Sequence, residues 1–186
     1  TALRLTRAAG PLAGRRALLT GASGGVGHYL TELLAGAGTE VVAVTSSDER
    51  GARLRDLGAA ETVTTPEDAP GGYDLVFESV GGSQFSAALA KAAPGATVLW
   101  YGQAGLQPIT IDFFAAMAQT PFTLKHFPHW ISERTDAEDL ATLVRLVAED
   151  RLHPEIGLVT DWADTARVLD DVYGRRVRGN AVLTLG

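Results

Sequence analysis

The chain of 186 residues contains no cysteine, which excludes thiolate catalysis, disulfide bonds and zinc sites built on cysteine. Basic residues are also few, since 16 lysines and arginines face 22 acidic residues and the formal net charge is −6. Nucleic acid and anionic membranes bind basic surfaces, so neither is an expected partner. With no apolar run of transmembrane length and no signal peptide at its start, we expect a cytoplasmic protein.

Histidine is scarce as well, and the spacing of its four copies does not indicate a metal site. His126 and His129 are three positions apart, but Pro128 interrupts any helix that would place them on one face. His28 is expected to point outward, and His153 falls in a predicted loop. We therefore expect no bound metal.

Strand and helix patterns alternate along most of the chain, which is typical of an α/β fold with a doubly wound, mostly parallel sheet and helices on both faces. Ser46 with Glu49, and Thr135 with Glu138, are predicted capping boxes at the starts of two helices. The predicted strands cover residues 17–19, 40–45, 61–63, 73–77, 96–101, 122–126 and 181–185. The predicted helices cover residues 2–9, 25–37, 46–57, 83–93, 136–147 and 162–173.

The most informative stretch is the sequence LLTGASGGVG at residues 18–27. It indicates a buried strand, a glycine-rich turn and the start of an amphipathic helix. The motif departs from G-x-G-x-x-G in that Ala22 replaces the first glycine. Small residues let the backbone approach a pyrophosphate, and a helix that begins near Gly25 offers unpaired N–H groups to it. We interpret the stretch as a dinucleotide site; the alternative is a glycine-rich loop without a ligand.

The end of the second predicted strand bears on which dinucleotide binds. An NAD site usually has an acidic residue there, whereas this chain has Thr45 and Ser46. Asp48 and Glu49, slightly further on, suit the first turn of the next helix. Ser46 and Arg50 could hold a 2′-phosphate, which favours NADP(H). The alternative for Arg50 is a solvated helix residue.

Two more glycine-containing loops, ESVGG at 78–82 and YGQAG at 101–105, end the fourth and fifth predicted strands. Ligands of doubly wound folds bind at this edge of the sheet, so we expect these loops to flank the ribose and nicotinamide. They could also be plain strand-to-helix turns. The complete set of expected cofactor-binding residues is Thr20, Ala22, Gly24, Gly25, Val26, Thr45, Ser46, Arg50, Ser79, Val80, Tyr101, Gly102 and Gln103.

Together these three segments, with LGAA at 57–60 and RGNAVL at 178–183, resemble the zinc-independent, quinone-oxidoreductase branch of the medium-chain dehydrogenase/reductases. The resemblance implies hydride transfer from NADPH to a quinone, an enone or a similar small electrophilic substrate. It matches Gly24, Gly25 and Val26 to the pyrophosphate turn. It also places Val80 and the 101–105 loop beside the nicotinamide.

The resemblance further implies two parts: an NADP(H)-binding Rossmann domain at residues 1–128, and a segment at 129–186 that in the family returns to a catalytic domain. That N-terminal catalytic domain has no counterpart in this sequence, so no catalytic residue or proton donor is assigned. We expect a fragment or one component of a split enzyme, acting as a homodimer or with a companion catalytic domain. Asn180 stands where the family often has lysine.

Two alternatives compete with this interpretation. Short-chain dehydrogenases share the glycine pattern but need a tyrosine and a lysine four positions apart. The residues four positions after the tyrosines of this chain are Leu33, Phe77, Gly105 and Val177. That family is therefore disfavoured. The second alternative, a non-catalytic NADP(H)-binding sensor or scaffold, stays open because no acid or base is identified.

Overall fold

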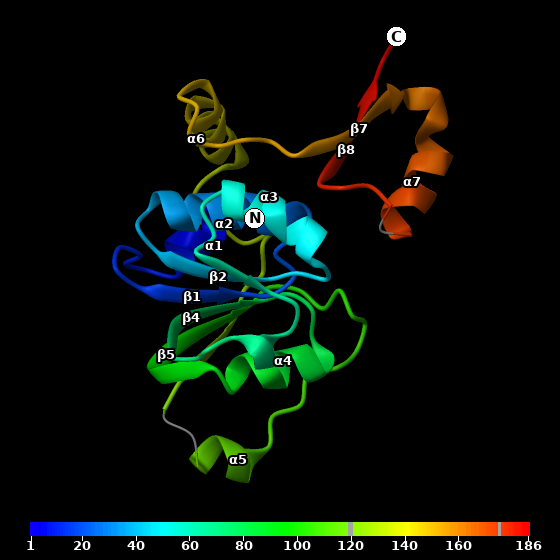
Figure 1. Cartoon of the computed structure of the whole chain (residues 1–186). Coiled ribbons are helices and arrows are strands. Elements are labelled where there is room, and N and C mark those ends of the chain that lie inside the picture. Colours follow the sequence, from blue (N-terminus) through cyan, green and yellow to red (C-terminus); the bar gives the residue numbers. More distant parts are fainter. Residues whose placement is uncertain (119–120, 175) are drawn as a thin grey trace.

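A six-stranded parallel sheet in the order β3-β2-β1-β4-β5-β6 forms the centre of the computed structural model, which describes residues 1–118, 121–174 and 176–186 (Figure 1). From β1 the chain moves outward to β3 and then returns to β4 on the other side of β1, as in a Rossmann fold. The strands are β1 Arg16–Leu19, β2 Glu40–Val44, β3 Glu61–Val63, β4 Tyr73–Glu78, β5 Ala92–Trp100 and β6 Thr123–His126.

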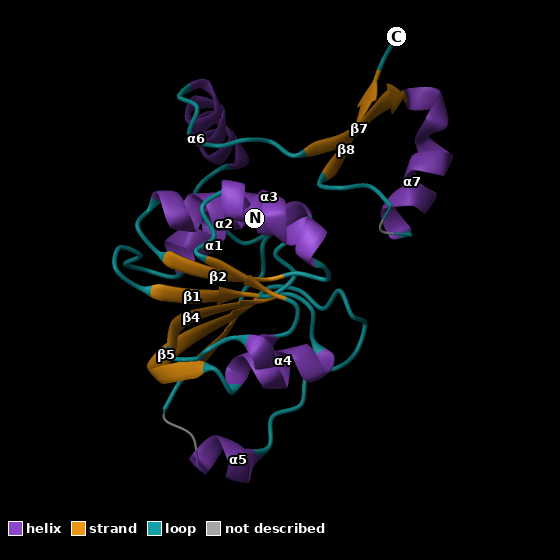
Figure 2. Cartoon of the chain, viewed as in Figure 1, coloured by secondary structure: helices purple, strands orange, loops and turns teal. Residues whose placement is uncertain are grey.

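Helices cover both faces of this sheet, which confirms the predicted doubly wound architecture (Figure 2). One face carries α1 (Ala2–Ala8), α2 (Gly25–Gly36) and α3 (Asp48–Asp56). The other carries α4 (Gly82–Leu89), and α5 (Phe113–Ala118) lies further out on the same side, beyond α4 (Figure 1). Outside the first layer, on the side of α1 and α2, lies α6 (Asp136–Ala148). No helix in the described part of the chain is long and apolar enough to cross a membrane.

The core has two halves because successive strand residues point to opposite faces of the sheet. Leu19 and Phe77 pack with Leu34 of α2 in one apolar cluster. Leu18 packs with Phe85 of α4 in the other. Both faces are covered, so the central strands are continuously apolar rather than alternating.

Residues 153–186, which we call the C-terminal arm, leave this body and form a second, two-stranded parallel sheet (Figure 1). Its elements are β7 (Ile156–Asp161), a 3₁₀ turn (Trp162–Asp164), α7 (Thr165–Tyr173) and β8 (Asn180–Thr184). β7 was not predicted, because its apolar residues are mostly exposed and pack on no core of the described chain.

Two local predictions are corrected, and one helix was missed. The helix predicted to residue 93 ends at Leu89, and β5 begins at Ala92, because Pro94 and Gly95 occupy a bulge between the pairs that β5 makes with β4. α5 was not predicted at all. The capping box expected at Ser46 is wrong, since Ser47 caps α3 by accepting the Arg50 N–H at 3.4 Å.

The second capping box is confirmed. Thr135 accepts the backbone N–H of Glu138 at 3.3 Å, and the Glu138 carboxylate accepts the Thr135 N–H at 2.9 Å. The Thr135 N–H and then the Thr135 hydroxyl, which both donate to this carboxylate, lower the pKa of Glu138. The box therefore defines where α6 begins.

Candidate functional site

The first turn of α2 leaves backbone donors without partners among the described residues. Gly24 is the N-cap, in an extended conformation, and no side chain caps the helix. The N–H groups of Gly25, Val26 and Gly27 therefore lack partners within the helix. With the positive end of the helix dipole, they form a site suited to an anion.

Glycine is required at two positions around this turn. A Cβ on Gly27 would overlap the carbonyl oxygen of Ala22, so only glycine lets α2 pack this closely on the turn. Gly21 has φ +62°, and a Cβ there would lie 2.6 Å from Oγ of Ser79. The glycines thus hold the turn against both α2 and the loop that follows β4.

The loops after β1, β4 and β5 join into one wall at the carboxyl edge of the sheet. The Ser79 N–H donates to Oγ1 of Thr20 at 3.1 Å, which links the first two loops. The N–H groups of Ala104 and Gly105 donate to the carbonyls of Ser79 and Val80, both at 2.8 Å, which links the second and third. The structure therefore brings together the three segments predicted to surround the cofactor.

Tyr101 begins the third loop, with its ring packed against the core on the α2 side. Burial raises the pKa of its phenol to about 12, although a hydrogen bond with Ser79 opposes the shift. The phenol therefore keeps its proton at physiological pH. Gly102 and Gln103 follow on the surface of the loop, and the Gly102 carbonyl accepts the indole N–H of Trp100 at 2.7 Å.

The end of β2 lies next to the glycine turn, because the Ala22 N–H donates to the Val44 carbonyl at 3.1 Å. Ser46 is exposed and Arg50 is half-buried in the first turn of α3. Thr45 is buried instead, and its hydroxyl has no partner among the described residues. The side chains of Thr20 and Ala22 are fully buried behind the turn.

His28 directly follows the glycine turn, and the expectation that it points outward is wrong. It is buried in α2, where its Nδ1 lies 3.0 Å from the carbonyl of Gly24. Burial lowers the pKa of the ring, despite the opposing contact with Gly24. A four-residue spacing from the N-cap glycine is the only signal that the sequence offers for this contact.

The C-terminal arm contacts the body beside the same turn. The Asn180 amide donates to the Tyr29 hydroxyl at 3.2 Å, and its Oδ1 lies 3.4 Å from where a Cβ of Gly25 would stand. Glu155 bridges Arg53 of α3 and Arg178, at 2.8 Å to each. Sequence reasoning did not place these residues near the turn.

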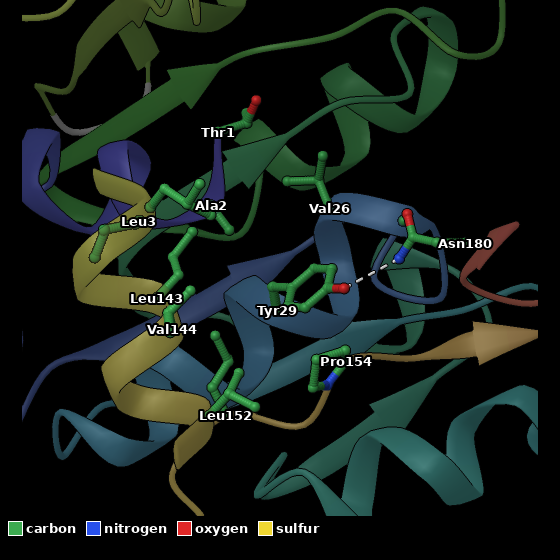
Figure 3. A pocket seen from close by; sticks show the side chains of 13 residues that line it. Thr1, Ala2, Leu3, Val26, Tyr29, Leu143, Val144, Leu152, Pro154 and Asn180 are labelled. Carbon is green, nitrogen blue, oxygen red and sulfur yellow. Dashed lines mark hydrogen bonds between the residues drawn. The ribbon is translucent and has the colours of Figure 1, made fainter. Parts of the chain in front are cut away.

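An apolar groove of about 700 Å³ runs from the turn between α1, α2 and α6 (Figure 3). Leu143, Val144 and Leu152 line one side, and the Tyr29–Asn180 hydrogen bond lies at the other. Such a lining suits an apolar surface and not a diphosphate. The groove reaches the anion-binding turn, because Gly25 and Val26 belong to its lining.

The strand order, the glycine turn and the joined loops define a Rossmann fold of the dinucleotide-binding kind. Residues 25–149 match the family model described as zinc-binding dehydrogenase, and the chain belongs to that family. The described residues contain no group of three or more histidines, aspartates and glutamates that could hold a metal ion. The described residues therefore do not provide a site for the zinc ion to which the family's name refers.

Among curated relatives, prostaglandin reductase-3 of Bos taurus is 27% identical over 199 residues, which cover 92% of this chain and 52% of the relative. An acryloyl-coenzyme A reductase of Sulfurisphaera tokodaii is 29% identical over 156 residues, 82% of this chain and 45% of the relative. The chain thus spans about half the length of the curated relatives it matches.

Solved structures agree with this assignment. A mycobacterial quinone oxidoreductase matches 99% of this chain and 61% of its own, with a TM-score of 0.87 and 26% identity. A mycobacterial structure solved as a complex with NADPH has a TM-score of 0.86, the same identity and the same coverage. The fold and the quinone oxidoreductase-like resemblance are therefore confirmed.

Proposed function

We propose that this chain is the NADP(H)-binding part of an oxidoreductase that transfers hydride to a quinone, an enone or a similar conjugated carbonyl substrate. The observation that carries the proposal is the uncapped first turn of α2, which opens beside the joined loops after β4 and β5. The NADPH complex of a structural neighbour and the reductase names of the relatives support it.

In this proposal the chain binds and orients the cofactor, and the nicotinamide supplies the hydride when bound. The N–H groups of Gly25 and Val26 hold the pyrophosphate. Ser46 after β2 and Arg50 in the first turn of α3 hold the 2′-phosphate. Val80 and the 101–105 loop flank the nicotinamide.

We propose that residues 1–128 form the cofactor domain and that residues 129–186 belong with a catalytic domain. The substrate contacts would come from that catalytic domain, which would cover the apolar groove, or from a second copy of the chain in a homodimer. Leu140 and Val144 of α6 line this groove and are exposed, which supports an additional covering layer.

The anion site is tested with Gly24→Val, which adds bulk at the turn without requiring a positive φ. Its Cβ would lie 3.2 Å from the Gly21 carbonyl oxygen, and its methyl groups would block the pyrophosphate. We expect NADPH fluorescence titration to show at least about a hundredfold loss of affinity. Gly36→Val at the far end of α2, where nothing lies within 4 Å, is the matched control. Equal NADPH affinity in both variants would reject the site.

The 2′-phosphate contact is tested with Arg50→Glu. Reversing the charge should weaken NADPH by about tenfold or more and leave NADH within about twofold, because only NADPH carries the phosphate. Isothermal titration with both cofactors measures this ratio. Equal losses for both cofactors would show that Arg50 does not contact the phosphate.

A further inference from the structure

Glu78, the last residue of β4, is fully buried behind the wall of loops. One oxygen of its carboxyl, Oε1, accepts three hydrogen bonds. The donors are the Thr20 hydroxyl at 3.1 Å and the N–H groups of Val80 at 2.8 Å and Gly81 at 3.0 Å. The other oxygen, Oε2, is buried without a partner among the described residues.

The three bonds to Oε1 join two of the proposed cofactor loops. Thr20 leads into the glycine turn, and its hydroxyl also accepts the Ser79 N–H at 3.1 Å. Val80 and Gly81 belong to the loop after β4. Together with the Ser79 N–H, this one oxygen atom therefore ties the loop to the turn.

The surroundings disfavour a charged carboxylate. Within the described chain, Glu78 faces Thr20 after β1, its own loop and Tyr101 after β5, and no cation interacts with it. Tyr101 is neutral, as its pKa of about 12 implies. Burial raises the pKa of Glu78, against the opposing effect of its three hydrogen bonds. A buried carboxylate with one unpaired oxygen costs more than a neutral acid with one unpaired O–H.

We propose that Glu78 acts as a neutral carboxylic acid, a positioning residue whose Oε1 holds the loop after β4 against the glycine turn. Its proton resides on Oε2, so that all three donors can share Oε1. The consequence for NADP(H), which rests on the proposed function, is that loss of this proton at high pH weakens cofactor binding by adding a negative charge behind the site.

Two substitutions distinguish the loss of the ionisable carboxyl from the loss of the hydrogen-bond acceptor. In Glu78→Gln the amide oxygen can accept the same three hydrogen bonds without a charge. We expect this variant to bind NADPH within about twofold of the wild type at pH 7. Glu78→Ala removes the acceptor and should weaken NADPH by about tenfold or more. An equal loss in both variants would overturn the proposal.

The pH profile tests the proton itself. As pH rises through the raised pKa of Glu78, the NADPH affinity of the wild type should fall, whereas that of Glu78→Gln should stay flat. Asp74→Asn, a carboxyl-to-amide change at the other end of β4, should follow the wild-type profile. A Glu78→Gln profile that falls like the wild type would overturn the assignment.

Infrared spectroscopy and hydrogen exchange test the protonation and the positioning role of Glu78 in the absence of cofactor. A protonated carboxyl C=O band at pH 7 should be present in the wild type and absent from Glu78→Gln. The Val80 and Gly81 amides should exchange at least about tenfold faster in Glu78→Ala only. If the wild type fails to bind NADPH but these results hold, the proposed function fails and the role of Glu78 stands. A missing carboxyl band overturns the role of Glu78 whatever the cofactor does.

Discussion

The body and the C-terminal arm both contain parallel strands, but only those of the body are covered. Leu18 and Leu75 of the central sheet are fully buried between helices, whereas Val159 of β7 is 61% exposed. Parallel sheets are normally covered on both faces, and a two-stranded sheet alone is marginally stable. In the described chain, the buried apolar core therefore stabilises the body, whereas a few polar contacts hold the arm.

Leu75→Ala and Val159→Ala test this difference, because they should lower the free energy of unfolding by unequal amounts. Leu75 lies in β4 between β1 and β5, so its truncation should leave a cavity and lower the free energy of unfolding by about 2–5 kcal/mol. The same kind of truncation on exposed Val159 should change it by less than about 0.5 kcal/mol. Urea unfolding measures both. Similar losses would mean that the arm is part of the cooperative core.

Glu155→Gln tests how the arm is held. The change removes the carboxylate that bridges Arg53 of the body and Arg178 of the arm, and leaves two arginines side by side. We expect amide exchange in β7 and β8 to become about tenfold faster, with β1 and β4 unchanged. Glu149→Gln, which loses two exposed arginine contacts on α6, is the control and should leave the arm unaffected. Unchanged exchange in the arm would assign its attachment to other contacts.

The same difference explains how far the fold could be predicted. The body was predicted because each strand repeats a local pattern of apolar residues that its own helices cover, as in β1, β2 and β4. β7 has the exposed sequence IGLVTD, whose apolar residues meet no core of the described chain. Its partner β8 lies more than a dozen residues away, and sequence periodicity does not report such a pairing.

The site divides in a similar way. The glycine turn and the two later loops were placed at one edge because parallel strands bring their carboxyl ends together. The buried contacts behind them were not predictable, because they depend on tertiary packing. Glu78 has the same pattern of neighbours in sequence whether its carboxyl turns inward or outward. The approach of Asn180 to Gly25 requires the path of the whole arm.

The smallest expected effect concerns two histidines whose pKa values should be shifted in opposite directions. In the body, burial lowers the pKa of His28 below its ordinary 6.5. In the arm, hydrogen bonds first to Glu32 of α2 and then to Asp150 raise the pKa of His153. His28 should therefore destabilise the fold as pH falls below 6.5. His153 should stabilise it below 6.5, an effect lost as pH rises through its raised pKa.

NMR titration of the histidine ring protons measures both pKa values, with His153→Gln identifying the curve of the arm. The stability of the wild type should decrease as pH rises past 6.5, and His153→Gln should not show this decrease. Because His153 is exposed, we expect this change to be smaller than that of Glu155→Gln. Shifts of both histidines in the same direction would contradict the contrast between a buried body and a surface-held arm.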